Sequence, residues 1–177
     1  MTIYIALLRG INVGKNNRIK MADLKNLLET MGLEKVKTYI QSGNVLFESS
    51  DDAARLSQQL EEEISKTFGF PVPVILRTAE EYEQIIRDCP YSMESLKEGE
   101  SIQLAFLAGE PSQEKIDNLR SFKSEPDECF INGKEVYLYL RQSILDSKLA
   151  AQLPKLEVLA TVRNWKTVIK LSTMIEK

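Results

Sequence analysis

The sequence predicts an α+β protein made of two similar halves, a tandem duplication of a ferredoxin-like β-α-β-β-α-β(-α) unit with mixed sheets and helices on one face. Strand-like and helix-like apolar patterns follow one another in the same order in residues 3–88 and again in residues 102–176. That order is the ferredoxin-like one. We therefore infer an internal duplication, with a first half at 1–89, a linker at 90–100 and a second half at 101–177.

Local sequence signals predict each element of the first half. The apolar run at its start is typical of a buried strand, and Ser42-Gly43 is a tight turn between two strand-like runs. Thr78 and Glu81 have the spacing of a helix-opening capping box. In chain order we expect a strand at 3–8, a helix from Met21 that ends near Gly32, strands at 36–41 and 44–48, a helix capped by Ser49, Ser50 or Asp51, a strand at 74–77, and a helix from 78 to Cys89-Pro90.

The second half repeats this order after a polar, acidic stretch. Asn132-Gly133 between two apolar runs is a strong hairpin signal. Pro154 interrupts the helical pattern that Ser147 can cap. We expect a strand at 102–107, a helix begun by Pro111-Ser112, strands at 128–131 and 135–140, the interrupted helix, a strand at 158–162, and a final helix capped by Asn164.

Composition excludes several kinds of chemistry. The 177 residues include no histidine, which removes imidazole metal ligands, histidine bases and Ser-His-Asp triads. Cys89 and Cys129 lack a CxxC spacing; a disulfide between them stays open, although a reducing compartment disfavours it. We expect no metal and no cofactor. No apolar run is long enough for a membrane helix and the start lacks a signal-peptide pattern, so we expect a cytoplasmic protein with no membrane partner.

A long basic connection follows the first strand. Residues 9–20 carry Arg9, Lys15, Arg18 and Lys20, and no acid occurs before Asp23. The connection after strand 102–107 is much shorter. Long loops in compact domains are commonly functional or disordered, so we interpret residues 9–20 as a binding loop. The alternative is a mobile, solvated loop whose cations aid solubility, with Asp23 in a salt bridge to Lys20 or Arg18.

Chain geometry predicts what this loop approaches. With right-handed crossover, the first two strands run parallel and the third runs back between them. The loop then lies at the same end of the sheet as Gln41–Asn44. In the second half, the helix after the last strand begins with Arg163-Asn164-Trp165-Lys166, where helix stability favours acids. These cations either pair with surface acids or help to bind an anion.

We therefore expect one anion-binding cleft between the halves. Residues of the second half can join it only if the halves pack head to tail. The predicted ligand-binding residues are Arg9, Asn12, Lys15, Lys20, Gln41, Ser42, Asn44, Arg163, Asn164 and Lys166.

Three separated motifs resemble one protein family. They are Leu8-Arg9-Gly10-Ile11-Asn12-Val13-Gly14, Tyr39-Ile40-Gln41-Ser42-Gly43-Asn44-Val45 and Arg163-Asn164-Trp165-Lys166-Thr167-Val168; Ser147-Lys148-Leu149 matches as well. The chain is similar to a family of small bacterial cytosolic proteins known only as domain-of-unknown-function family 1697. The resemblance implies two similar α+β halves, no established activity and no catalytic residue to carry over. The family's uninterrupted helix after residue 149 differs from this chain, which has Pro154.

Three functions remain open. The first is a module that binds a phosphate-bearing ligand, a nucleotide or nucleic acid. The second is an enzyme acting on a phosphorylated or acidic small molecule, and the third is a protein–protein adaptor of undetermined oligomeric state. RNA binding on a sheet face needs exposed aromatic residues, whereas we expect Tyr4, Phe47 and Trp165 to lie in the core. A concave polar site favours the first two functions, and an apolar patch favours the third.

Overall fold

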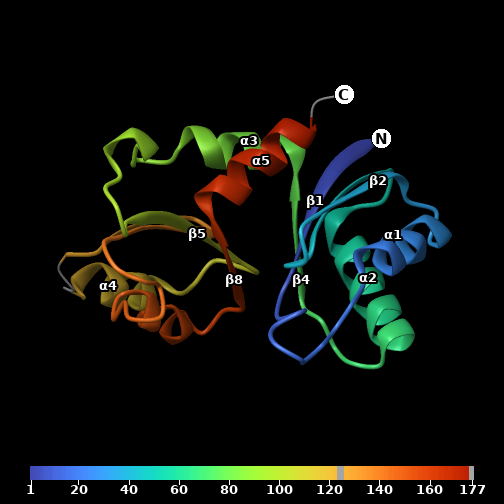
Figure 1. Ribbon diagram of the computed structural model, residues 1–177, viewed down its shortest axis with the longest axis horizontal. Coiled ribbons are helices and arrows are strands. Elements are labelled where there is room, and N and C mark those ends of the chain that lie inside the picture. The colour runs from blue at the N-terminus through green and yellow to red at the C-terminus, as the bar shows by residue number, and fades with distance from the viewer. Residues whose placement is uncertain (123–125, 176–177) are drawn as a thin grey trace. The chain divides into compact units, whose positions relative to one another are not determined.

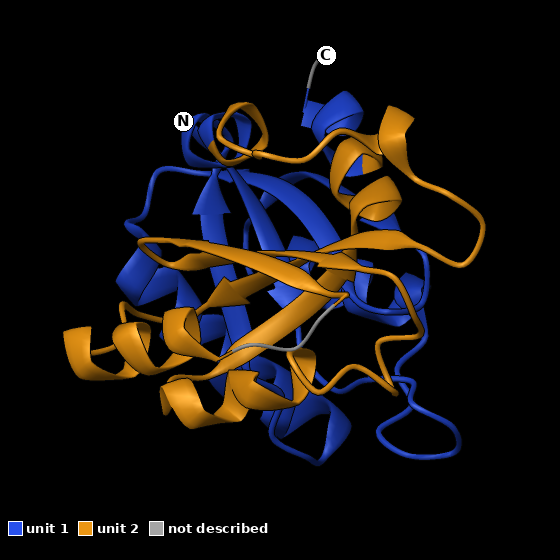
Figure 2. Cartoon of the chain, turned by 90° about the vertical axis from the view of Figure 1, so that its left-hand side faces the viewer, with its two compact units in different colours: residues 1–84, 171–177 blue, residues 85–170 orange. Residues whose placement is uncertain are grey.

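The computed structural model describes residues 1–122 and 126–175 of the chain (Figure 1). Residues 176–177, the end of the predicted second half, lie outside the described residues. The chain forms two compact units (Figure 2). Unit 1 is Met1–Gln84 together with the chain from Leu171 onward, and unit 2 is Ile85–Lys170.

Unit 1 is built on a four-stranded sheet in the order β2-β3-β1-β4. β1 and β2 run in the same direction, because each is antiparallel to β3, which lies between them. The expected strand directions, with the first two strands parallel and the third between them, are thus confirmed, and the order is the ferredoxin-like one. The elements are β1 (Thr2–Leu8), α1 (Met21–Thr30), β2 (Glu34–Tyr39), β3 (Asn44–Ser49), α2 (Ala53–Phe68), β4 (Val74–Thr78) and α3 (Ala79–Arg87), whose last residues belong to unit 2.

Unit 2 repeats this topology with the order β6-β7-β5-β8. The α+β duplication predicted from the sequence is confirmed. The elements are the short 3-10 helix η1 (Met93–Ser95), β5 (Ser101–Leu107), α4 (Gln113–Ser121), β6 (Glu128–Asn132), β7 (Glu135–Leu140), the 3-10 helix η2 (Ala150–Leu156), β8 (Ala160–Asn164) and α5 (Trp165–Ile175), whose end belongs to unit 1.

One detail of the predicted architecture is corrected. The sheets are not mixed, because every hydrogen-bonded strand pair in both units is antiparallel. The parallel strands of each β-α-β segment are separated by the returning third strand, and the fourth strand joins the first from the opposite direction. No parallel pair therefore comes into hydrogen-bonding contact.

Each sheet packs helices against one face to form a core. In unit 1, the alternate residues Tyr4, Ala6 and Leu8 of β1 pack with apolar residues of α1 and α2. In unit 2, Ala105 and Leu107 of β5 pack with α4 and η2. Strand alternation predicts these faces directly, since side chains at every second residue point to the same side.

Of the predicted helix starts, the capping box is confirmed, while the cap of α2 is corrected and η2 begins at Ala150 with Leu149, not Ser147, at its N-cap position. The Thr78 hydroxyl accepts from the Glu81 N–H at 3.1 Å, and the Glu81 carboxylate accepts from the Thr78 N–H at 2.8 Å, so the predicted capping box is present. Asp52, and not Ser49, Ser50 or Asp51, caps α2 by accepting from the Arg55 N–H at 2.9 Å. β3 extends through Ser49, which shifts the cap toward Asp52.

The compact units divide the chain at other points than the sequence-based boundaries. Residues 85–100, which include the predicted linker, belong to unit 2, and the end of α5 from Leu171 belongs to unit 1. Two hydrogen bonds illustrate this assignment. The Tyr137 hydroxyl donates to the Ile85 carbonyl within unit 2, and the Lys37 ammonium donates to the Met174 carbonyl at 3.5 Å within unit 1.

Candidate functional site

The loop of residues 9–20, which follows β1, is organised by the side chain of Asn12. Its Oδ1 accepts from the Ile19 N–H at 2.8 Å, and its Nδ2 donates to the carbonyls of Ile19 at 3.0 Å and Gln41 at 2.7 Å. Asn12 itself adopts a left-handed φ of 56°, a conformation that asparagine tolerates better than most residues. One amide thus closes the loop on itself and ties it to the β2–β3 turn.

Close packing also joins the loop to that turn. The Leu8 N–H donates to the Gly43 carbonyl at 2.9 Å. A Cβ on Gly43 would lie 2.8 Å from both Ile11 Cδ1 and Leu8 Cβ, and Gly43 has a φ of +90°. Buried Asn44 donates to the Tyr39 carbonyl at 3.0 Å and to the Ser42 hydroxyl at 2.9 Å. The predicted proximity of the loop and the turn is confirmed.

This geometry separates the predicted site residues of unit 1 into two groups. Both Nδ2 protons of Asn12 and of Asn44 are used to hold backbone or turn atoms, so these amides build the site. The side chains of Arg9, Lys15, Lys20 and Gln41 are exposed, and Ser42 is half-buried. Among the described residues, no acid forms an ion pair with Arg9, Lys15, Arg18 or Lys20, and the salt bridge considered for Asp23 is not formed.

The loop ends at a helix start that has an unusual cap. Lys20 occupies the N-cap position of α1 in an extended conformation and makes no side-chain capping hydrogen bond. Ser, Thr, Asp and Asn are the residues that stabilise this position, because their side chains accept from first-turn N–H groups. Asp23 in the first turn is the acid that the helix dipole favours, and Lys20 places a cation beside it at the same helix end. Arg18 differs, since its guanidinium donates to the Gly14 carbonyl at 2.8 Å.

Two exposed apolar residues belong to the same segments and are not part of the sequence-based site. Val13 on the loop is 63% exposed, and Ile40 on the β2–β3 turn is 48% exposed. Ile40 has a left-handed φ of 47°, which is a strained conformation for a β-branched residue. The sequence pattern predicted a strand over 36–41 and so did not indicate a turn residue here. In the structure β2 ends at Tyr39, and Ile40 begins the turn.

The predicted residues of the second half lie in unit 2. Arg163 is not part of a cationic helix start; it lies in β8 opposite Leu104 and is buried. Its Nη1 donates to the Thr161 hydroxyl at 2.8 Å and the Val162 carbonyl at 3.1 Å. Asn164 caps α5 by accepting from the Lys166 N–H at 2.9 Å, and the Lys166 side chain is exposed. A single cleft that joins these residues to the loop stays a prediction.

The aromatic residues that the sequence analysis expected in the core are buried. Tyr4 and Phe47 lie in the core of unit 1 and Trp165 is buried, as expected. In unit 2, Tyr137 and Tyr139 of β7 are covered by residues 85–100. The hydroxyl of Tyr137 donates to the Ile85 carbonyl, and that of Tyr139 donates to the Ser95 carbonyl at 3.2 Å. Tyr137 and Tyr139 are therefore occupied within the unit, whereas Phe130 of β6, whose ring centroid lies 6.1 Å from that of Tyr137, is 44% exposed.

Reactive side chains are scarce in the described part of the molecule. Cys89 and Cys129 are free, and burial raises the pKa of both thiols, which disfavours a thiolate nucleophile. No cluster of three or more Cys, Asp or Glu residues within 1–122 and 126–175 could hold a metal ion. In the same ranges, no helix is both long and apolar enough to span a bilayer.

The buried carboxylate of Asp127 in unit 2 has a structural role. Burial raises the pKa of Asp127, but hydrogen bonds from the Arg141 N–H, the Gln142 amide and the Ser147 hydroxyl outweigh burial and hold it below its ordinary value. Ser147 in turn accepts from the Ala150 N–H at 3.1 Å at the start of η2. This network explains the Ser147-Lys148-Leu149 segment as a support for η2.

Comparison with known proteins places the chain in a family. Residues 1–137 match the family DUF1697, described as "Protein of unknown function", and the chain belongs to it. The fold is similar to that of a solved structure, the conserved bacterial protein SP0830 from Streptococcus pneumoniae, with a TM-score of 0.79, 26% sequence identity and 99% of each chain covered. No curated protein matches the sequence.

Proposed function

We propose that the chain binds a phosphate-bearing ligand, a nucleic acid in preference to a free nucleotide, at the loop of residues 9–20 in unit 1. The observation that carries this proposal is the set of exposed cations Arg9, Lys15 and Lys20 on a loop held in place by Asn12, with no described acid paired to them. The loop lies beyond the end of β1 in Figure 1.

The loop's order supports binding over a solubilising role. A loop whose cations only aid solubility needs no internal scaffold, whereas this one contains the Asn12 hydrogen bonds and the Val13–Asn16 bridge. Ordering the loop in advance lowers the entropy lost on binding. The uncapped start of α1 adds backbone N–H groups that favour an anion.

A nucleic acid suits the surface better than a compact nucleotide. Arg9, Lys15 and Lys20 stand at three separate positions of the loop between β1 and α1, which suits a ligand with several phosphates better than one with a single phosphate. The neighbouring exposed residues Val13 and Ile40 offer apolar surface to unstacked bases.

Fluorescence anisotropy with a labelled single-stranded oligonucleotide tests the proposal. The wild-type chain is compared with the variant Arg9→Ala/Lys15→Ala and with a matched control, Arg55→Ala/Lys66→Ala, which removes the same charges from the exposed surface of α2. We expect the loop variant to bind about tenfold or more weakly. A plot of the logarithm of the binding constant against the logarithm of the salt concentration should have a slope that is smaller in magnitude by about 1.4 for this variant. Each of the two lost phosphate contacts contributes about 0.7 to that slope.

Two results would overturn the proposal. One is the absence of salt-dependent binding by the wild-type chain at low ionic strength. The other is an equal loss of affinity in the loop variant and the α2 control, which would reduce the effect to net charge. Competition with ATP distinguishes a nucleotide site from a nucleic-acid site. At a nucleotide site, ATP should displace the oligonucleotide at concentrations far below that of the salt in the buffer.

A protein–protein adaptor is the second candidate. The strained and exposed Ile40 supports it, because exposed apolar residues in unfavourable backbone conformations are found at recognition sites. Size-exclusion chromatography with light scattering tests the version in which the partner is another copy. An Ile40→Asn variant should then shift the chain from dimer to monomer, while a monomeric wild type excludes that version.

A further inference from the structure

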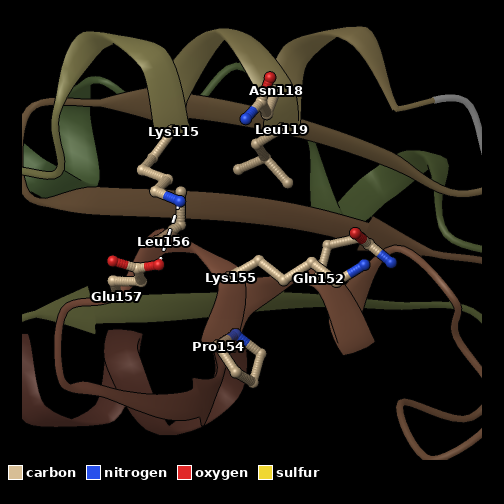
Figure 3. Close-up of a pocket in the computed structure, with 8 residues that line it drawn as sticks. All are labelled: Lys115, Asn118, Leu119, Gln152, Pro154, Lys155, Leu156 and Glu157. Atoms are coloured by element: carbon tan, nitrogen blue, oxygen red, sulfur yellow. Dashed lines mark ion pairs between the residues drawn. The ribbon is translucent and has the colours of Figure 1, made fainter.

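Unit 2 contains a pocket of about 410 Å³ on the helix side of its sheet. Figure 3 shows that its walls come from two elements, α4 on one side and η2 with the residue that follows it on the other. This volume lies within the range of about 300–1,000 Å³ that is typical of small-molecule sites. The lining residues are Lys115, Asn118, Leu119, Gln152, Pro154, Lys155, Leu156 and Glu157.

The pocket lies where the two repeats differ. In unit 1 the second helix, α2, has 16 residues and packs Leu56, Leu60 and Ile64 into the core. The corresponding element of unit 2, η2, is a 3-10 helix of 7 residues that contains Pro154. η2 has Glu157, whose φ is 59°, at its C-cap position, and the pocket lies between this shorter element and α4.

The polar groups of the pocket are suited to an anion. Lys115 Nζ and Glu157 Oε1 form an ion pair at 3.0 Å, so these two charges offset one another. The Lys155 ammonium and the Asn118 side-chain amide have no hydrogen-bond or ion-pair partner among the described residues. With two lysines and one glutamate, the lining carries one net positive charge. That charge resides on Lys155.

The floor of the pocket is apolar. Leu119 of α4 and Leu156 of η2 are buried, and Pro154 adds its ring. Binding sites for small molecules characteristically combine such surfaces with a few polar groups that fix orientation. The combination suits a molecule that has one charged end and one apolar part.

We propose that this pocket binds a small organic anion, with a carboxylate or phosphate group next to an apolar portion. Lys155 neutralises the anionic group. The Asn118 amide supplies hydrogen-bond donors, and so does the second Nε2 proton of Gln152, whose Nε2 also donates to the Lys148 carbonyl at 3.5 Å. The apolar portion rests on Leu119 and Leu156, while the Lys115–Glu157 ion pair closes one end. This site involves a different unit and different residues from the loop of residues 9–20, so it stands independently of nucleic-acid binding there.

Titration followed by ¹H–¹⁵N correlation spectra tests this proposal on the full chain. The probes are benzoate, phenyl phosphate and uncharged benzamide, which share the ring and differ in the polar group. We expect saturable shifts of the amides of 115–119 and 152–157 with benzoate or phenyl phosphate, with Kd on the order of 1 mM, and no saturation with benzamide. Comparison of the two anions shows whether the site prefers a carboxylate or a phosphate.

Three variants make the result specific. Lys155→Gln should weaken anion binding at least about fivefold, and Asn118→Trp should block it by filling the pocket from an exposed position. Lys148→Gln removes an exposed lysine of the same unit outside the pocket and should bind as the wild-type chain does. The proposal is overturned if neither anion saturates, if benzamide binds equally well, or if the Lys155 and Lys148 variants lose affinity alike.

Discussion

The two units share a sheet order but differ in what connects and covers it. Unit 1 has twelve residues between β1 and α1 and a long α2, whereas unit 2 connects β5 to α4 through residues 108–112 and has only η2 in the second helical position. Each unit therefore has its candidate site where it departs from the other. Duplication conserved the strand pairing, and the differences in loops and helix length created distinct surfaces.

The hairpin turns provide the strongest test of this comparison. Gly43 and Gly133 occupy equivalent turns with φ of +90° and +60°, but only Gly43 is packed against the preceding loop. We expect Gly43→Ala to lower the free energy of unfolding by about 3 kcal/mol, through left-handed strain plus steric overlap with Leu8 and Ile11. Gly133→Ala, with no atom closer than 3.9 Å, should cost about 1 kcal/mol. Urea denaturation measures both, and equal losses would show that loop packing contributes nothing.

The second helical elements are started in different ways. Asp52 caps α2 alone, whereas η2 depends on Asp127, which is buried and accepts three hydrogen bonds. Asp127→Ala leaves those donors without an acceptor and should lower the free energy of unfolding by about 2–4 kcal/mol, against about 1 kcal/mol for Asp52→Ala. If the two variants lose the same stability, the Asp127 network is no more than an ordinary cap.

The Asp127 contribution should depend on pH in a defined direction. Because the folded pKa lies below the unfolded value of about 3.9, the carboxylate stabilises the fold fully above that pH. Its contribution is lost as the pH falls through the lower, folded pKa. The difference in stability between wild type and Asp127→Asn should therefore be constant from pH 5 to 7 and shrink in acid. If this difference in stability grows in acid, the pKa of Asp127 is not lowered in the folded chain.

Ile40 should show that the turn of unit 1 carries strain. Asparagine accepts a left-handed φ more readily than isoleucine does, and the Ile40 side chain is 48% exposed. We expect Ile40→Asn to raise the free energy of unfolding by about 1 kcal/mol. Thermal unfolding measures this effect. A loss of stability instead would mean that the isoleucine packs productively and that the strain explanation is wrong.

Lys20 should give the smallest effect and link stability to binding. Lys20→Ser places a good N-cap residue before α1 and should stabilise the chain by about 0.5–1 kcal/mol. The same substitution removes a cation from the candidate site and should weaken oligonucleotide binding. Calorimetry should therefore show a gain in stability, and anisotropy a loss of affinity. This pair of results would distinguish the start of α1 from the start of α4, which Ser112 caps.

Local sequence patterns determined most of the fold. Strand alternation, the Asn132-Gly133 hairpin, the Thr78–Glu81 capping box and the repeated element order are signals among residues close in the chain, and each corresponds to the structure. The common direction of β1 and β2, with β3 returning between them, then placed the loop of residues 9–20 beside the β2–β3 turn. The basic character of that loop is likewise readable from the sequence alone.

Tertiary structure decided the role of individual side chains. In the sequence, Asn12 resembles a ligand-binding amide. In the structure its amide donates to the Gln41 carbonyl, 29 residues away, and so holds the loop in place. Arg163 resembles a helix-start cation, but β8 continues through it and buries it. The pocket beside η2 is lined by residues of α4 and η2, which are distant in the sequence. Such features arise from contacts between distant segments, and residue type and spacing carry no information about them until the chain is folded.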